Sequence, residues 1–208
     1  SLRRHNINSA PEKPHSSDNS ENMNCLWPGD PEGNDTQRLV HALNAALAEQ
    51  ATHCLDLHCW AHFLAAAVLP HPDRPDSCRF AEVSGFPLAF RWPLANLRAD
   101  PPPTRFNVGM HFGLTGRGTL TCELSGQYLI NEQQVRLGLR CAQNLLRVLG
   151  MWPGEPEGTT EGPTWVDRAA VIRVAAPQSG LFVAAGQEPG GWVRKGDLLG
   201  HLLSDEDL

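Results

Sequence analysis

Two segments of the chain carry apolar residues at the three- and four-residue spacing of an amphipathic helix. The first follows Asn34, and Gln37 stands three positions later, as in a capping box. The second follows Asn131, with Gln134 in the same relation, and ends before Gly150, a residue type favoured just after a helix. Two helices are therefore predicted. Their apolar stripes comprise Leu39, Leu43, Ala46 and Leu47 in the first, and Val135, Leu139, Ala142, Leu145, Leu146 and Leu149 in the second.

Two other segments alternate in the manner of β-strands. Residues 52–59 place Cys54, Asp56 and His58 on one face, and Leu55, Leu57 and Cys59 on the other. Residues 119–124 alternate in the same way and end in Glu-Leu-Ser-Gly. The order of a helix, a strand, an irregular segment, a strand and a helix is typical of an α/β fold.

Between these strands the pattern is harder to interpret. Residues 70–107 are rich in proline, and within them Phe86–Trp92 is predicted as a short strand. Residues 113–118 are predicted as a glycine-rich loop.

The two ends of the chain differ from its middle. The α/β domain is assigned to residues 1–152. Within it, residues 1–21 are polar and are predicted to form a loop. Residues 153–164 have the composition of a linker. Residues 165–208 are predicted to form a small all-β unit, because short apolar runs at 170–175, 181–184 and 198–203 are separated by Gly and Pro.

Composition narrows the possible functions. The chain has 208 residues, of which 41% are hydrophobic and 19% charged, so an ordinary core is expected. The net charge of −6 argues against a nucleic-acid partner. No apolar run approaches the roughly 20 residues that cross a membrane, so no membrane partner is expected.

The cysteines and the first residues bear on the compartment. Six irregularly spaced cysteines are expected to be free thiols in a reducing environment. The chain begins Ser-Leu-Arg-Arg, without an initiator Met or a secretory signal, which predicts a processed or truncated cytoplasmic protein.

Three side chains near strand ends are candidates for chemistry. His58 stands at the tip of a strand that we expect to be central, and Asp56 shares its face, so the pair suits a metal ligand and the carboxylate that orients it. Glu123 ends the other strand, where a carboxylate can act as a general base on metal-bound water. The alternative interpretations are a hydrogen-bonded strand histidine and a solvent-facing glutamate.

Two other metal sites are conceivable from the sequence and are not favoured. His58 and His62 would form half of a helical zinc pair, but Cys59 stands where that motif has its glutamate. Cys54, His58 and Cys59 could form a cluster, but they have no Cys-x-x-Cys partner. The remaining histidines are interpreted as incidental: His5, His15, His41, His53, His71, His111 and His201.

Taken in order, these segments resemble the succinylglutamate desuccinylase and aspartoacylase family, relatives of the zinc carboxypeptidases. Residues 22–29 (Asn-Met-Asn-Cys-Leu-Trp-Pro-Gly) are similar to the family's Asp-Leu-Asn-Arg motif and the aromatic-Pro-Gly turn that follows it. Residues 56–58 match its Asp-Leu-His motif, and residues 123–126 its Glu-Leu-Gly-Gly strand end. Residues 179–182 and 192–200 resemble its closing β unit.

The resemblance implies a zinc-carboxypeptidase-like mixed sheet flanked by helices, incomplete at its N-terminal side, with a small C-terminal all-β unit. It implies a zinc-dependent hydrolase that cleaves the amide of an N-acyl amino acid or a similar small substrate; an oligomer is possible. The residue roles that it implies are zinc ligand for His58, general base for Glu123, substrate-carboxylate contact for Asn24, and orientation of another zinc histidine for Asp56.

The sequence also departs from the family pattern. The family's His-x-x-Glu zinc pair has no counterpart before residue 22, and Cys25 and Asn22 stand where the family has Arg and Asp. Two interpretations therefore stay open: a deacylase, or a degenerate or truncated non-catalytic homologue that binds a small ligand or a protein partner. Lys195 lies in a Val-x-x-Gly-Asp turn, so the C-terminal unit is interpreted as structural and not as a cofactor carrier.

Overall fold

The computed structural model describes residues 21–59, 65–94, 105–126, 130–158, 161–167, 170–172, 174–187 and 191–204. Its centre is a five-stranded mixed sheet with the strand order β1-β4-β2-β3-β5. Only the β4–β2 pair is antiparallel. The strands are β1 (His53–Cys59), β2 (Ala67–Leu69), β3 (Leu88–Arg91), β4 (Gly118–Leu124) and β5 (Thr164–Asp167).

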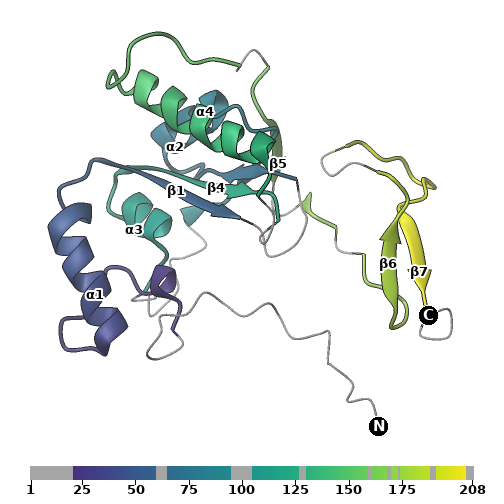
Figure 1. The fold of residues 1–208 in the computed structure, drawn as a ribbon, viewed down its shortest axis with the longest axis horizontal. Coiled ribbons are helices and arrows are strands. Elements are labelled where there is room, and N and C mark those ends of the chain that lie inside the picture. The colour runs from purple at the N-terminus through teal and green to yellow at the C-terminus, as the bar shows by residue number, and fades with distance from the viewer. Residues whose placement is uncertain are drawn as a thin grey trace.

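Helices lie on both sides of this sheet (Figure 1). The helices α2 (Pro75–Val83) and α4 (Glu132–Val148) cover one side. The other side carries α3 (Val108–Leu114) and, farther from the sheet, α1 (Asp35–Leu43). A single 3₁₀ turn, η1 (Met23–Cys25), precedes α1, and a π-helical turn, η2 (Asn44–Ala48), follows it. The α/β class and the mixed sheet predicted from the sequence are confirmed.

The hydrophobic core lies between the sheet and the pair α2 and α4. Leu120 and Cys122 of β4 are fully buried there against Phe80 of α2 and against Cys141 and Leu145 of α4. The opposite face of β4 carries Thr119, Thr121 and Glu123, as expected from the alternation. The sheet therefore has an apolar side that stabilises the fold and a polar side that faces α3.

The first predicted helix is confirmed at its start and differs at its end. The side chain of Asn34 accepts from the backbone of Gln37, and the Gln37 side chain accepts from the backbone of Asn34, which completes the capping box. The α-helix ends at Leu43, and the chain continues through the π-helical turn to Ala48.

The second predicted helix is also present, but its apolar stripe was assigned wrongly in part. Asn131 caps α4, and Gly150 follows it at φ +70°. Val135 and Leu139 are exposed, whereas Gly138, Cys141, Asn144 and Leu145 are buried. A capping box with Gln134 does not form, because its side chain accepts from the backbone of Ser125 instead.

Two helices were missed in the proline- and glycine-rich region. Arg74 precedes α2, and Pro75 occupies its first turn, where a proline costs no hydrogen bond. Asn107 caps α3 through the backbone of Met110. The predicted loop at 113–118 is wrong at its start, because Gly113 belongs to α3, and at its end, because Gly118 begins β4.

The segment after α4 is only partly a linker. The side chain of Asn144 accepts from the backbone N–H of Glu157 and donates to its carbonyl, both at 2.9 Å. β5 then pairs with β3 in parallel, so residues 164–167 belong to the large sheet and not to a C-terminal unit. The other domain boundaries stay predictions.

The C-terminal segment contains one antiparallel hairpin, β6 (Leu181–Ala184) and β7 (Gly200–Leu203). It lies apart from the five-stranded sheet in Figure 1. The apolar run at 170–175 forms no strand in its described residues. The small all-β unit predicted from the sequence is thus present as a hairpin.

Candidate functional site

The parallel pairing of β1 with β4 brings the predicted site residues together. His58 lies opposite Glu123 in the register, and Asp56 lies opposite Thr121. All four side chains project from the side of the sheet that faces α3. The two strands also end together, because the pairing continues one residue further to Cys59 and Leu124.

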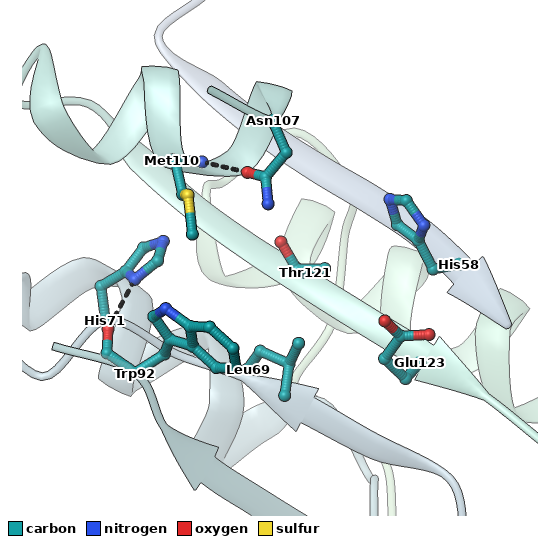
Figure 2. A pocket seen from close by; sticks show the side chains of 8 residues that line it. All are labelled: His58, Leu69, His71, Trp92, Asn107, Met110, Thr121 and Glu123. Atoms are coloured by element: carbon teal, nitrogen blue, oxygen red, sulfur yellow. Dashed lines mark hydrogen bonds between the residues drawn. The ribbon is translucent and has the colours of Figure 1, made fainter. Parts of the chain in front are cut away.

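A pocket of about 220 Å³ opens above this part of the sheet. Figure 2 shows His58 and Glu123 at one end, Thr121 in the middle, and a group of larger side chains at the other end. The strand β4 supplies its floor and α3 one wall. The lining residues are His58, Leu69, His71, Trp92, Asn107, Met110, Thr121 and Glu123.

Asn24 reaches this site from η1. Its side-chain Oδ1 accepts from the backbone N–H of Val108 at 3.1 Å, which fixes the amide so that Nδ2 faces Nε2 of His58 at 3.0 Å. The turn after η1 is anchored as well, since Trp27 pairs with Phe106 through two backbone hydrogen bonds of 3.0 Å. The carboxamide of Asn24 is therefore held in place through both its oxygen and its nitrogen.

The same turn requires a glycine. Gly29 has φ +88°, and a Cβ at this position would lie 2.2 Å from the backbone nitrogen of His41 in α1. Only glycine accepts both the left-handed conformation and this close approach. The aromatic-Pro-Gly sequence thus packs directly against α1 and positions the Asn24 segment.

His58 lies between a donor and an acceptor. Its Nε2 atom is 3.0 Å from Nδ2 of Asn24 and 3.0 Å from Oδ2 of Asp56. A single ring nitrogen cannot accept from the amide and donate to the carboxylate at once. The hydrogen bond and charge of Asp56, with the charge of Glu123, raise the pKa of His58, although burial opposes them.

Glu123 occupies a half-buried position on the second strand of the sheet. Burial raises the pKa of its carboxyl group above the ordinary value, while the nearby His58 lowers it and Asp56 raises it further. A carboxylate with a raised pKa is a better proton acceptor than one in water. Thr121 beside it is buried, and Glu123 is half-buried and lines the pocket.

The site offers some of the groups that a metal ion needs. Oδ2 of Asp56 is buried and lies 3.0 Å from Nε2 of His58, so a carboxylate and an imidazole converge here. A catalytic zinc, however, takes three protein ligands. Within the described ranges no three His, Cys, Asp or Glu side chains gather in that way. The described residues therefore do not make a complete zinc site.

The structure also decides other metal interpretations. Cys59 points away from Cys54 and His58, since successive strand residues alternate in direction, so these three form no cluster. Burial and the charge of Asp56 raise the pKa of Cys54 to about 12, so its thiol stays protonated at neutral pH. His62 lies outside the described residues. All six cysteines are free.

The strand β1 and Cys25 both lie farther from the centre of the site than the sequence suggests. The strand β1 was expected to be central, but in the described sheet it lies at the edge next to β4. Cys25, at the position of the family's arginine, is exposed on η1 and does not line the pocket.

Sequence reasoning missed the other end of the pocket. Leu69 ends β2, His71 follows it, and Trp92 follows β3, so the carboxyl ends of two adjacent parallel strands build this wall. His71 was interpreted as incidental, yet it is 4% exposed and its Nδ1 lies 2.8 Å from the Trp92 carbonyl oxygen. The short strand β2 gave too little periodicity to reveal this arrangement.

The comparison with known families decides the identity of the fold. Residues 6–149 match the model of the succinylglutamate desuccinylase/aspartoacylase catalytic domain. The chain belongs to this family. It is a hydrolase family and is typically zinc-dependent. The resemblance of residues 22–29, 56–58 and 123–126 to the family's motifs is thereby supported by a match across most of the chain.

Solved structures agree with this assignment. The chain is 25% identical to a succinylglutamate desuccinylase/aspartoacylase from Rhodobacter sphaeroides, with a TM-score of 0.69 over 93% of this chain and 58% of that one. It is 19% identical to the product-bound ectoine utilization protein EutE (DoeB) from Ruegeria pomeroyi, with a TM-score of 0.67 over 91% of this chain and 57% of that one. A succinylglutamate desuccinylase from Silicibacter sp. TM1040 is 18% identical, with a TM-score of 0.69 over 91% and 57%.

The chain thus spans less than three-fifths of the length of these three structures. A comparison with curated proteins gives no match. No helix in the described part of the chain has the length and apolar character needed to cross a membrane.

Proposed function

We propose that this chain hydrolyses the amide bond of a small N-acyl amino acid and that Glu123 carries the proton in this reaction. The observation that supports the proposal most strongly is the pairing of His58 with Glu123 at the ends of β1 and β4, where both side chains line the pocket. The chain that carries this pocket belongs to a hydrolase family. Asn24 beside them supplies an amide that can contact a substrate carboxylate.

In this proposal the carboxylate of Glu123 accepts a proton from the attacking water. The water oxygen bonds to the amide carbon, the carbon–nitrogen bond breaks, and Glu123 delivers the proton to the leaving amine. The raised pKa of Glu123 suits it to both transfers, since the group must gain and lose a proton near neutral pH. Asp56 acts by orienting His58.

We assign His58 as one zinc ligand, which requires that further ligands come from outside the described residues. The cofactor is measured directly by the zinc content of the purified chain, of His58→Ala and of the control His53→Ala, a change elsewhere on the same strand. About one zinc per chain in the wild type and the control, lost in His58→Ala, is the expected result. No zinc in the wild type would remove His58 as a ligand in this chain.

Activity is tested with N-acetyl, N-succinyl and other N-acyl amino acids, by measuring amine release with and without added zinc. Release of free amino acid from at least one of them is expected. The second candidate, a non-catalytic ligand-binding homologue, is favoured by the incomplete metal-ligand set in the described chain. Binding of an N-acyl amino acid without turnover, under every zinc condition, would support this candidate and refute the first.

A further inference from the structure

The end of the pocket away from Glu123 has a chemistry of its own. We call Leu69, His71, Trp92 and Met110 the distal pocket; they come from the ends of β2 and β3 and from α3 (Figure 2). Among the described lining residues there is no lysine or arginine, and Glu123 is the one carboxylate. The distal pocket is therefore lined mainly by the apolar side chains Leu69, Trp92 and Met110, and among the described lining residues no cationic side chain of lysine or arginine reaches it.

His71 is the polar group of the distal pocket. A carbonyl oxygen can only accept, so Nδ1 of His71 carries the proton that it donates to Trp92 at 2.8 Å. Burial lowers the pKa of His71, which keeps the ring neutral. In a neutral imidazole protonated on Nδ1, Nε2 presents a lone pair and accepts a hydrogen bond.

The orientation of this ring is fixed from several sides. The backbone N–H of His71 donates to Oγ of Ser77, which is completely buried. A Cβ on Gly113 would lie 3.1 Å from Cδ2 of the His71 ring, so α3 packs closely against it. Figure 2 shows the other ring nitrogen on the side that faces Met110. Within the described residues, the hydrogen bond of the His71 ring is the one from Nδ1 to Trp92, which leaves Nε2 for a group in the pocket.

We propose that the distal pocket binds an uncharged acyl group whose far end donates a hydrogen bond to Nε2 of His71, such as a terminal carboxamide or hydroxyl group. This inference rests on the proposed function, in which Asn24 contacts the amino-acid carboxylate and the acyl group is left for the other end. A terminal carboxylate, as in a succinyl group, would face the lone pair of His71, and the described lining residues offer it no lysine or arginine.

The test uses two fragments that differ only at this terminus. N-methylsuccinamide ends in a neutral carboxamide, and N-methylsuccinamate ends in a carboxylate of nearly the same shape. Their dissociation constants are measured by NMR titration of the full chain, together with the ¹⁵N shift of the His71 ring. The neutral fragment is expected to bind at least about tenfold more tightly and to shift Nε2 in the direction of an accepted hydrogen bond.

Variants connect the effect to named residues. His71→Phe keeps an aromatic ring without the acceptor and should weaken the neutral fragment about fivefold. The control His201→Phe, on the exposed face of β7, should not. Met110→Arg places a cation in the distal pocket and should reverse the preference. If His71→Phe does not fold, the ¹⁵N shift in the wild type decides the role of His71.

Equal or tighter binding of the anionic fragment, an unmoved His71 resonance, or no binding of either fragment would overturn the inference. These measurements need no turnover. A chain that binds the neutral fragment but hydrolyses no N-acyl amino acid would therefore refute the proposed function and leave the pocket assignment standing. Turnover of N-succinyl substrates in preference to N-succinamoyl substrates would do the opposite.

Discussion

The contact between Asn24 and His58 links the turn before α1 to the strand that carries the candidate site, and its energy can be measured. Asn24→Ala removes two side-chain contacts, one to the Val108 backbone and one to His58, while the backbone bond of residue 24 to Asn22 is kept. At about 1 kcal/mol for each neutral hydrogen bond, the expected loss in the free energy of unfolding is about 2 kcal/mol.

Only one of these two contacts, the one from Nδ2 of Asn24 to Nε2 of His58, is also lost when His58 is replaced. A double-mutant cycle of Asn24→Ala and His58→Ala should therefore give a coupling energy of about 1 kcal/mol, even though His58→Ala also removes the contact with Asp56. Urea unfolding at about pH 8.5 provides the four values, at a pH where an imidazole is largely neutral and can accept.

The control cycle pairs Asn24→Ala with His53→Ala. His53 lies at the start of β1, where its ring contacts Phe80, so the two changes should be additive within about 0.5 kcal/mol. Additivity in the Asn24–His58 cycle as well would show that the carboxamide does not contact the imidazole in solution. The geometry on which the candidate site depends would then be refuted.

Three further changes test the fold and the pocket by denaturant unfolding. Leu120→Ala, in the centre of the core, should cost about 2–5 kcal/mol. Leu57→Ala, on the same side of the sheet but exposed on the edge strand β1, should cost less than about 1 kcal/mol; equal losses would contradict the burial of the core at β4. Asn144→Ala removes three hydrogen bonds to Val83 and Glu157 and should lower the free energy of unfolding by about 3 kcal/mol. The control Gln143→Ala, at the exposed neighbouring position, should lower it by about 0.5 kcal/mol or less. An equally small decrease for Asn144→Ala would mean that the segment after α4 is a free linker. Burial lowers the pKa of His71 in the folded protein, so on acidification the unfolded chain binds a proton at this residue before the folded protein does. The free energy of unfolding should therefore fall as the pH drops below about 6.5, and it should fall less in His71→Phe. Identical pH profiles of the wild type and the variant would show that His71 is not buried as a neutral ring.

Local signals predicted the elements that depend on local chemistry. The capping box at Asn34 and Gln37 was confirmed because both of its hydrogen bonds lie within four residues. The strands at 53–59 and 118–124 were found because their two faces meet different environments, which enforces strict alternation. His58 and Glu123 were each identified as candidates from motifs at the ends of these strands, but their pairing across the sheet could not be read from either motif.

The parts that were missed depend on tertiary structure. The strand β2 has three residues, too few to show a period, and its burial on both faces makes it continuously apolar. The buried face of α4 was predicted wrongly in part, because Val135 and Leu139 are exposed although they are apolar. Asn144 is buried although it is polar, because its side chain binds the backbone of Glu157. His71 gave no signal, because its role depends on a carbonyl oxygen 21 residues away.

The proposed hydrolysis depends on Glu123. The most direct measurement is kcat/KM for the N-acyl amino acid that the wild-type chain hydrolyses best, compared between the wild type, Glu123→Gln and the control Glu82→Gln on the exposed side of α2. Loss of about 10²–10⁴-fold in Glu123→Gln, with folding and the control unchanged, is the predicted result. Turnover by Glu123→Gln at the wild-type rate would contradict the assignment of Glu123 as the proton carrier.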